Sequence, residues 1–485
     1  MPAQARQMYI NGQWAGSSDS RVFADRNPAT GGLFCEAADA NRDDMIRAIE
    51  SARDAQAEWA SLSHLQRAGY LNKVGDLLVE RQQDLAANLC DEGGGWMGKC
   101  MFETSYAPNI MRAAAATTYD SLGEVLPSEY GKLTLVVRKP MGVVGVISPW
   151  NFPLLLTLRG IAFALAAGNT VVLKPSEETP VSGGLMVAEL FEAAGVPAGV
   201  LNVVTCSRER VEEVGDELVI NPAVSAISFT GSTAVGRMIA AKAGGMLKKA
   251  CMELGGKDPL IILEDADLQR AIDATVFGAF MHQGQICMAA ERIIVHESLA
   301  DAVIEGVTER ARGLKVGDPR DFANIIGPII NQKQLDNIHG QVTQAREAGA
   351  TIHTGGEYQG LFYQPTVISG VTPQMRVFRE ETFGPVAPFT TVSSDEEAIA
   401  LANDSVYGLS AGIITEDEER GLAVAQRLQS GMAHVNDCPV YDEPHIPFGG
   451  VKSSGMGRHG GRWAVESFTE PHVISLERGG RHYPF

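Results

Sequence analysis

The central part of the chain alternates short β-rich runs with helical segments, and this order restricts the folds open to it. The β-rich runs occupy residues 143–148, 170–174, 200–204 and 226–230. A helical segment at 154–167 separates the first two runs. Another begins at Thr179-Pro180 and ends at Gly195, since proline suits a first helical turn and glycine a helix end. Strands joined by helices in this way pair in parallel. The order therefore predicts a doubly wound α/β sheet, in which ligands bind beyond the carboxyl ends of the strands.

A second series of the same kind begins after Gly255-Gly256. The expected strands are 259–263 and 292–295, followed by a strand–helix–strand unit at 386–415, and the expected helices are 268–280, 299–314 and 333–348. At 485 residues the chain is too long for one hydrophobic core. We therefore predict two doubly wound α/β domains.

Segments outside these two series complete the prediction. An Asn-Gly pair within 9–14 indicates a short entry hairpin, and helical periodicity covers 42–59 and 65–92. Residues 134–139 and the C-terminal segment 467–485 fit neither domain. We interpret both as edge strands available for pairing with another subunit.

Charge and composition exclude several classes of protein. The net charge of −19 opposes binding to nucleic acid, because phosphates would be repelled. The N-terminus lacks the apolar core of a signal peptide, and the longest apolar stretch, 160–168, is far shorter than a membrane span of ~20 residues. Seven cysteines without clustering argue against disulfides, and no His or Cys pair has zinc spacing. These features predict a cytoplasmic protein with reduced thiols, no metal, and no membrane partner.

A candidate nucleophile lies in the second series. Cys287 follows a Gly-Gln pair and precedes small residues, in the stretch GQICMAAER. An attacking thiol needs little steric bulk around it and must become a thiolate, although its ordinary pKa is about 8.5. A lone cysteine between apolar residues is more often a buried structural thiol. The segment alone leaves both interpretations open.

Two polar residues at the ends of expected strands are candidate partners for this thiol. Glu253 precedes two glycines in MELGGKDP, where a half-buried carboxylate can have a raised pKa and act as a general base. The alternative is an ordinary exposed glutamate. Asn151, in SPWNFP, can project its amide into the crevice above the sheet. The alternative for that motif is a rigid strand-to-helix turn.

Two further stretches suit a nucleotide. Lys174 and Glu177, in KPSE, follow the second strand and can hold ribose hydroxyls, with a solvated loop as the alternative. The glycine-rich turn FTGSTAVG at 229–236 leads into a helix whose N–H groups favour pyrophosphate. Its GxxxxG spacing differs from the standard dinucleotide fingerprint, so this match is weak by itself.

The order of these motifs resembles that of the aldehyde dehydrogenase superfamily. The matching blocks are PWNFP, KPSE, FTGSTAVG, ELGGK, GQIC, EETFGPV at 380–386 and PFGGVKSSG at 447–455. The resemblance implies an aldehyde dehydrogenase fold of three parts. These are an NAD-binding domain at 1–121 and 141–253, a catalytic domain at 254–446, and a small β oligomerisation extension at 122–140 and 467–485.

The resemblance also implies roles for individual residues. Cys287 is the expected nucleophile, Glu253 the general base, and Asn151 forms the oxyanion hole with the Cys287 backbone N–H. The expected coenzyme contacts are Ser148, Pro149, Trp150, Lys174, Ser176, Glu177, Gly231, Ser232, Gly236, Leu254, Glu381 and Phe383. NAD should be preferred over NADP, because Glu177 accepts hydrogen bonds from a ribose 2′-hydroxyl and repels a 2′-phosphate.

The implied activity is NAD-dependent oxidation of an aldehyde to a carboxylic acid by a homodimer or homotetramer. The reaction would run through a thiohemiacetal and a thioester on Cys287, and the presence of Glu253 favours hydrolysis of that thioester over transfer to coenzyme A. A structural member of the superfamily without turnover is the alternative from another class. The retention of Cys287, Glu253 and Asn151 opposes it.

The expected substrate is an aromatic aldehyde. Residues 436–450, the tract 95–103, the tail 481–485 and Arg159 resemble benzaldehyde, vanillin and salicylaldehyde dehydrogenases, although Cys438, Pro439 and Cys100 depart from that group. The expected substrate contacts are Phe152, Leu156, Arg159 and Tyr441. As an alternative, Arg159 would anchor the carboxylate of a semialdehyde acid such as succinate semialdehyde.

Overall fold

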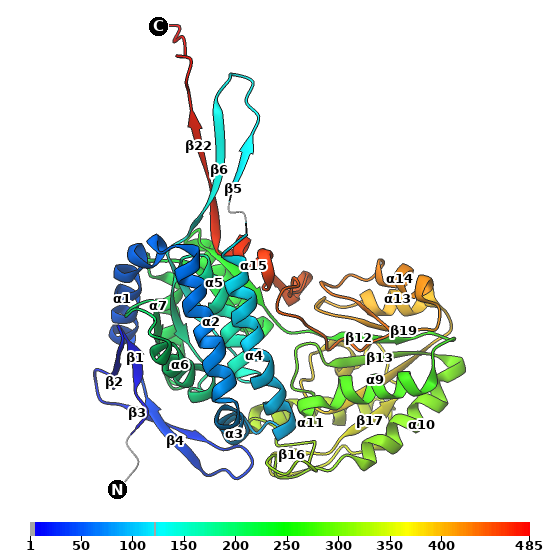
Figure 1. Cartoon of the computed structure of the whole chain (residues 1–485). Helices are drawn as coiled ribbons and strands as arrows, with labels where there is room; N and C mark the ends of the chain where they lie inside the picture. The colour runs from blue at the N-terminus through cyan, green and yellow to red at the C-terminus, as the bar shows by residue number, and fades with distance from the viewer. Residues whose placement is uncertain (1–4, 121–122) are drawn as a thin grey trace.

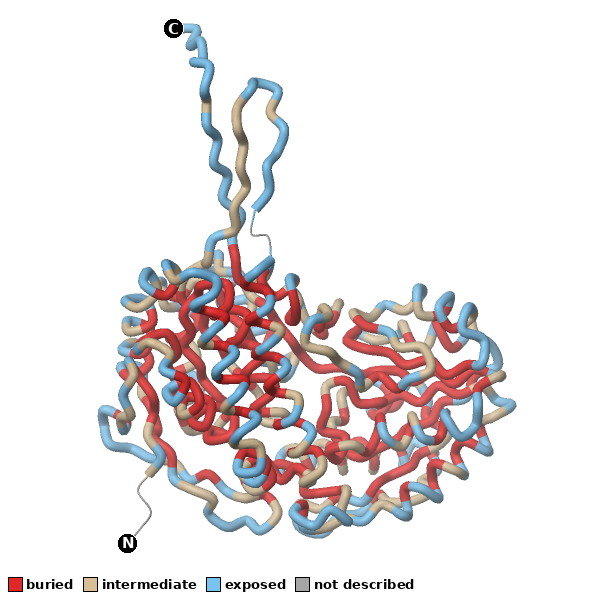
Figure 2. The backbone as a smooth tube through the Cα atoms, viewed as in Figure 1, coloured by how far each residue is buried: buried red, intermediate tan, exposed pale blue. Residues whose placement is uncertain are grey.

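The structure is a computed structural model that describes residues 5–120 and 123–485. Two α/β lobes lie side by side, and a β arm rises from the first lobe (Figure 1). Each lobe contains one large, mostly parallel sheet, as the two strand–helix series predict. The central strands of both sheets are buried, whereas much of the arm is exposed (Figure 2).

The first sheet has eight strands in the order β2-β1-β9-β8-β7-β10-β11-β21. Its strands are β1 (Met8–Ile10), β2 (Gln13–Ala15), β7 (Val143–Ile147), β8 (Thr170–Lys174), β9 (Leu201–Val203), β10 (Val224–Thr230), β11 (Lys249–Glu253) and β21 (Gly455–Met456). From β7 the chain runs outward through β8 to β9, then returns to the other side of β7 for β10 and β11. This reversal makes a topological switch point between β7 and β10, where a doubly wound sheet opens a crevice at its carboxyl edge.

Helices cover both faces of this sheet. They are α1 (Arg42–Ser61), α2 (His64–Glu80), α3 (Gln82–Gly93), α4 (Met97–Thr117), α5 (Pro153–Ala166), α6 (Met186–Ala194), α7 (Val211–Ile220), α8 (Thr233–Gly245) and α15 (Gly461–Ser467). The helix predicted at 65–92 is two helices, α2 and α3, which meet at the non-helical Arg81. The helix predicted from Thr179 begins as a short π-helix, η1 (Val181–Leu185), and it ends at Gly195 as expected.

Helix α4 was not predicted from the sequence. It packs against α2, α3, α5 and α15, so several of its sides are covered. A helix buried on several sides has no single apolar stripe, and its sequence therefore lacks the periodicity of a surface helix. Pro108 within it also argues against a helix when read from the sequence alone.

The second sheet has the order β14-β17-β18-β13-β12-β19-β20. Its strands are β12 (Asp258–Ile262), β13 (Ala290–His296), β14 (Thr351–Thr354), β17 (Thr366–Ser369), β18 (Val386–Val392), β19 (Gly412–Ile414) and β20 (His434–Val435). Its helices are α9 (Leu268–Phe280), α10 (Glu297–Gly313), α11 (Gln332–Glu347), α12 (Arg376–Arg379), α13 (Asp395–Asn403) and α14 (Glu418–Ala425). Two hairpins, β3 (Val22–Arg26) with β4 (Leu33–Ala38) and β15 (Tyr358–Gln359) with β16 (Phe362–Tyr363), lie outside the large sheets.

The arm joins the two segments that fitted neither domain. It consists of β5 (Gly123–Leu126), β6 (Leu133–Pro140) and β22 (Thr469–Leu476), and β22 pairs antiparallel with β6 along its whole length. The predicted domain boundary at 121/122 lies outside the described residues, as do residues 1–4. After the second lobe the chain returns to the first, because β21 joins the first sheet and α15 packs on α4 and α5.

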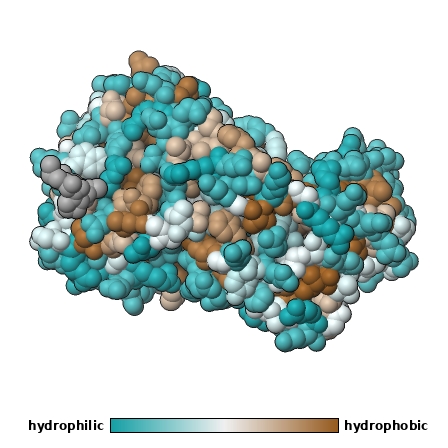
Figure 3. Space-filling model, turned by 90° about the horizontal axis from the view of Figure 1, so that it is seen from below, coloured by the Kyte–Doolittle hydropathy of each residue, from teal (hydrophilic) through white to brown (hydrophobic). Residues whose placement is uncertain are grey.

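The face seen from below is mostly hydrophilic, with hydrophobic side chains in scattered patches (Figure 3). Among the described helices, none is long and apolar enough to cross a membrane. All seven cysteines are free thiols.

Candidate active site

A cleft of about 180 Å³ lies at the carboxyl edge of the first sheet, where the two lobes meet. It is lined by Pro149, Trp150, Asn151, Leu156, Thr230, Gly231, Ser232, Glu253, Leu254, Gly255, Cys287, Gln334, Asn337, Glu381 and Phe383. Because β7, β10 and β11 are parallel, the residues that follow each strand meet at one edge. The cleft therefore brings all three predicted catalytic residues together with most of the predicted coenzyme contacts.

The loop before β13 places Cys287 in this cleft. The loop leaves α9 through a short 3-10 turn, η2 (Met281–Gly284), in which His282 and Gln283 have positive φ angles of 51° and 55°. Cys287 is half-buried, and burial together with the nearby carboxylates of Glu253 and Asp258 raises the pKa of its thiol well above the ordinary value. The resting thiol is therefore protonated at neutral pH.

Close approach of the glycine pair fixes the cysteine loop against β11. A Cβ atom on Gly256 would lie 2.3 Å from the carbonyl oxygen of Cys287, so a larger residue would push the two segments apart. Gly256 therefore lets the end of β11 pack against the cysteine loop, and Gly255 leaves room for the Glu381 carboxylate, which a Cβ atom would approach to 2.6 Å.

The side chain of Asn151 is oriented by the cysteine loop. Its Nδ2 donates a hydrogen bond of 3.0 Å to the backbone carbonyl of Gln285, two residues before Cys287. A side-chain amide carries two hydrogens, so one fixes the group and the other is available in the cleft. This geometry suits the predicted donor to an oxyanion.

Glu253 is the last residue of β11, and its carboxylate is buried away from solvent. The residue is 2% exposed, and neither carboxylate oxygen has a hydrogen-bond partner within the described part of the chain. Burial raises its pKa to about 8, although Arg159 and Arg458 act in the opposite direction. A carboxylate with this pKa is a stronger base than an exposed glutamate.

The predicted pyrophosphate site lies at the start of α8. Ser232 caps the helix by accepting a hydrogen bond from the backbone N–H of Val235, and Gly231 donates its N–H to the carbonyl of Glu253 at 3.0 Å. A Cβ atom on Gly236 would lie 2.2 Å from Leu254. Glycine at this position therefore lets the helix N-terminus pack directly on the end of β11.

The other predicted coenzyme contacts of the first sheet do not line the cleft itself. Ser148, Lys174 and Ser176 are buried at the carboxyl ends of β7 and β8. The hydroxyl of Ser148 has no hydrogen-bond partner among residues 5–120 and 123–485. Lys174 Nζ donates to the Pro175 carbonyl at 3.0 Å. Ser148 and Lys174 thus provide buried hydrogen-bond donors at the carboxyl edge of the first sheet.

Glu177 lies between two cations. Its carboxylate is 3.7 Å from Lys174 Nζ and 3.0 Å from Arg208 Nη1. Burial raises the pKa of this carboxyl group, but Lys174, a hydrogen bond from a backbone N–H and Arg208 together outweigh burial and lower the pKa below the ordinary value. Sequence reasoning missed Arg208.

Glu381 and Phe383 close the cleft from the second lobe. Glu381 accepts a hydrogen bond of 3.0 Å from the backbone N–H of Gly256, and burial raises its pKa to about 8. Phe383 has a positive φ of 51°, its N–H donates to Glu291, and its ring meets the Trp150 ring edge-on at 5.4 Å. The predicted contacts from both lobes therefore face one space.

The predicted substrate contacts are only partly brought together. Leu156 lines the cleft, and Phe152 packs with Cys287 in an apolar cluster that also holds Met281 and Val440. Tyr441 lies outside the cleft, where its ring contacts His434 and its hydroxyl bonds Glu443. This position does not support the prediction that Tyr441 contacts the substrate.

Arg159 is buried and already paired. It forms an ion pair with Asp442, whose carboxylate also accepts a hydrogen bond of 3.0 Å from the Tyr106 hydroxyl. The guanidinium lies 4.1 Å above the centre of the Phe448 ring. Arg159 therefore holds the 436–445 loop against α5.

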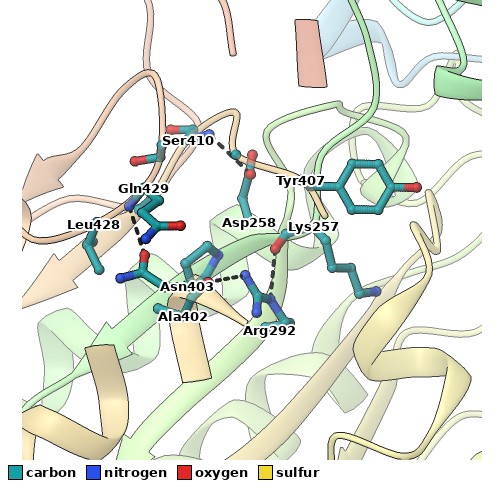
Figure 4. A pocket seen from close by; sticks show the side chains of 13 residues that line it. Lys257, Asp258, Arg292, Ala402, Asn403, Tyr407, Ser410, Leu428 and Gln429 are labelled. Atoms are coloured by element: carbon teal, nitrogen blue, oxygen red, sulfur yellow. Dashed lines mark hydrogen bonds between the residues drawn. The ribbon is translucent and has the colours of Figure 1, made fainter. Parts of the chain in front are cut away.

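A second, much smaller cavity of about 10 Å³ lies in the second lobe (Figure 4). Asp258 accepts a hydrogen bond from the N–H of Ser410 there, and Arg292 donates to the carbonyls of Lys257, Leu401 and Ala402. A space of this size accommodates about one water molecule. Its residues fasten β12 and β13 to the 402–410 segment.

Residues 14–474 match the Aldehyde dehydrogenase family. The chain belongs to this family. It is 45% identical over 461 residues to a benzaldehyde dehydrogenase of Pseudomonas putida whose name specifies NAD(+), covering 95% of this chain and 94% of that one. It is 45% identical over 480 residues to a vanillin dehydrogenase of Amycolatopsis sp. (strain ATCC 39116 / 75iv2), covering 98% and 97% of the two chains. The crystal structure of a salicylaldehyde dehydrogenase from Pseudomonas putida G7, complexed with salicylaldehyde, has a TM-score of 0.97 at 37% identity and covers 99% of each chain.

Several cleft residues of this aldehyde dehydrogenase were missed from the sequence. Gln334 and Asn337 are three residues apart on α11, which places them on one face of that helix, and Gln334 Nε2 donates to the carbonyls of Thr382 and Phe383. This three-residue spacing of polar side chains was the feature of the sequence that could have identified them. The sequence did not indicate which face of α11 meets the cleft.

Proposed function

We propose that the protein oxidises aromatic aldehydes to carboxylic acids with NAD as the hydride acceptor. The observation that carries this proposal is the shared cleft, in which the thiol of Cys287 and the carboxylate of Glu253 lie beside the switch-point crevice of the first sheet; within the described residues that carboxylate has no hydrogen-bond partner. A nucleophile and a base in one half-buried space suit a covalent mechanism in two stages.

The residues at the crevice suit NAD. Lys174 and the hydroxyl of Ser148 can donate to ribose and phosphate oxygens, and the first turn of α8 offers backbone N–H groups to pyrophosphate. When bound, NAD supplies the acceptor for the hydride that leaves the substrate carbon. The Glu177 carboxylate favours a 2′-hydroxyl over a 2′-phosphate, but its two cations reduce the repulsion. We therefore propose a modest preference for NAD over NADP.

The first stage is formation of the thioester. The thiol of Cys287 first loses its proton to water in the cleft. The thiolate then adds to the aldehyde carbon, and the carbonyl oxygen becomes an oxyanion. The second amide hydrogen of Asn151 and the backbone N–H of Cys287 are the proposed donors to this oxygen, and one such donor is worth ~3 kcal/mol. Loss of the thiolate from this adduct would only regenerate the aldehyde, and a carbanion is a far poorer leaving group, so the adduct advances to the thioester when the C–H electron pair leaves as hydride to the acceptor that bound NAD would supply.

The second stage is hydrolysis of the thioester. Glu253 takes a proton from water, the water oxygen attacks the acyl carbon, and the carboxylic acid and the Cys287 thiolate separate. With a pKa of about 8, Glu253 binds this proton more readily than an exposed glutamate does. The absence of a fixed hydrogen-bond partner for its oxygens in the described structure leaves them available to water.

Apolar and aromatic side chains around the cysteine support an aromatic substrate. Phe152 and Val440 pack in the cluster that contains Cys287, and Leu156 lines the cleft. Flat rings pack well against such walls, with about 0.5–1.5 kcal/mol per ring contact beyond simple burial. Arg159 is neutralised by Asp442, so it is a poor anchor for a substrate carboxylate, and the semialdehyde-acid alternative loses its main support.

The arm supports the proposal of a homo-oligomer. Val125 and Val473, on β5 and β22, are 69% and 63% exposed, and Ile474 and Leu476 on β22 are also exposed. An apolar three-stranded sheet that projects from the protein suits burial against a second copy. Size-exclusion chromatography with light scattering should give a dimer or tetramer, and deletion of 477–485 with Val473→Glu should reduce the assembly to smaller species.

The substrate proposal is tested by NADH formation with benzaldehyde, hydroxybenzaldehydes and methoxybenzaldehydes, short alkanals and succinate semialdehyde. We expect kcat/KM for the aromatic aldehydes to exceed that for alkanals by about tenfold or more. A higher kcat/KM for succinate semialdehyde that is lost in Arg159→Ala would contradict the aromatic assignment. No oxidation of any aldehyde would contradict the activity itself.

A further inference from the structure

A buried ion pair on α4 lies directly behind the turn that carries Asn151. Lys99 Nζ is 2.5 Å from Glu103 Oε2, and the two side chains are 2% and 0% exposed. Burying two charges is costly, and replacing such a pair by apolar residues is often neutral or stabilising. The pair is therefore weak evidence for a stabilising role, and its contacts point to a different one.

Each member of the pair contacts a different side of the turn. Lys99 Nζ donates a hydrogen bond of 2.8 Å to the backbone carbonyl of Asn151 and lies 4.2 Å from the centre of the Phe152 ring. Glu103 Oε1 accepts hydrogen bonds from the backbone N–H groups of Leu154 at 2.9 Å and Leu155 at 3.0 Å. The turn is thus held before and after Pro153.

These contacts replace an ordinary helix cap. The N-cap residue of α5 is Phe152, whose side chain cannot accept a hydrogen bond, so the first N–H groups of the helix need another acceptor. Glu103 supplies it from a neighbouring helix. The start of α5, and with it the position of Asn151, consequently depends on α4.

The amide of Asn151 is held from the opposite side by the cysteine loop. Its Nδ2 donates to the carbonyl of Gln285, while its own backbone carbonyl accepts from Lys99. An oxyanion donor is effective only when its orientation is fixed before the charge develops, and a displacement of about 1 Å costs much of its effect. We propose that Lys99 and Glu103 are positioning residues that hold Asn151, and the Phe152 ring beside it, in the geometry required for the first stage of the reaction. This inference rests on the proposed function.

The competing interpretation is that the pair only supports the packing of α4 on α5. A packing role would lower stability and affect kcat by the same factor whether or not residue 151 is asparagine. A positioning role acts through Asn151, so its effect on kcat should disappear once the amide is removed. A double-mutant cycle separates these two cases.

The test uses the full-length enzyme with benzaldehyde and NAD. The variants are Lys99→Met/Glu103→Gln, which removes both charges and keeps an acceptor for the α5 amides, and Glu103→Gln alone in case the double change impairs folding. Each is made with Asn151 and with Asn151→Ala. Thr104→Val is the matched control, because Thr104 is buried on the same helix and, in the part of the chain that the structure describes, its hydroxyl donates to the α4 carbonyls of Cys100 and Met101 and not to the turn at Asn151.

With Asn151 present, we expect the double change to lower kcat by about tenfold or more and Glu103→Gln to lower it about threefold, with KM for NAD altered less than about twofold. In the Asn151→Ala background both changes should alter kcat by less than about twofold. The control Thr104→Val should alter kcat by less than about twofold whether or not residue 151 is asparagine. Equal losses in the two backgrounds, or a loss in Thr104→Val as large as in the pair, would overturn the inference. A wild-type enzyme without aldehyde oxidation would instead contradict the proposed function.

Discussion

Glu253 and Glu177 are carboxylates at the same edge of the same sheet, and their surroundings are opposite. Glu253 ends β11 without a partner in the described structure, and burial raises its pKa to about 8. Glu177 follows β8 between Lys174 and Arg208, and these cations, together with a hydrogen bond from a backbone N–H, lower its pKa below the ordinary value. The strand end supplies the position of each carboxylate, whereas the neighbouring charges decide whether it acts as a base or as a fixed anion.

The largest expected effect concerns the nucleophile beside Glu253. Cys287→Ala should lower kcat for aldehyde oxidation by about 10⁴-fold or more, because no other side chain in the cleft can form the thioester. Binding of NAD, followed by fluorescence titration, should be retained. Cys206→Ala is the control, since Cys206 is fully buried in the first lobe and should leave the rate near that of wild type. Residual activity of a few per cent in Cys287→Ala would show that the nucleophile is another group.

The next effect tests whether Glu253 is the base. Glu253→Gln should lower steady-state turnover by about 10²–10⁴-fold, because the water that hydrolyses the thioester loses its proton acceptor. Rapid-quench measurements should still show a burst of NADH, since hydride leaves before hydrolysis. A normal steady-state rate would refute this role, and loss of the burst would assign Glu253 to activation of Cys287 as well.

The raised pKa of Glu253 also predicts a pH-dependent difference in stability. Its folded-state pKa of about 8 lies above the ordinary value of 4.5, so the folded protein binds more protons between these two pH values and wild-type stability falls as pH rises through them. Glu253→Gln does not titrate. Its stability relative to wild type should therefore increase by about 2–4 kcal/mol from pH 5 to pH 9, with most of the change below pH 8. Thermal denaturation of both proteins across this range measures it, and a constant difference in Tm would show that the carboxylate titrates normally.

The smallest effect concerns the paired glutamate. Glu177→Gln should raise kcat/KM for NADP relative to NAD by about tenfold, or about 1.4 kcal/mol, because it removes a negative charge near the predicted site of the 2′-phosphate. Arg208→Ala is the matched variant. It removes one of the two cations that offset Glu177, so it should shift the preference toward NAD. Measurement of kcat/KM for NAD and for NADP with both variants tests this prediction. If the NADP-to-NAD ratio of kcat/KM is unchanged in Glu177→Gln, the adenosine ribose binds away from Glu177.

Much of the fold follows from local features of the sequence. The two strand–helix series predicted both parallel sheets, and the Asn-Gly pair predicted the hairpin of β1 and β2, in which Asn11 and Gly12 have positive φ angles. Local rules of this kind succeed because the alternation of strands and helices and the requirements of a tight turn depend on neighbouring residues. The motifs after β7, β10 and β11 also predicted one shared edge, because parallel strands end on the same side.

The pKa values of the cleft carboxylates, and the contacts that hold the cleft residues in place, depend on the tertiary structure. Lys99 and Glu103 carry no sequence signal that connects them to Asn151, about fifty residues away, and α4 was not predicted at all. Arg159 was predicted to contact the substrate, but the fold brings Asp442 to it from a distant loop. The pKa of a carboxylate depends on burial and on charges that are distant in sequence, so Glu253 and Glu177 differ for reasons that their local motifs do not contain.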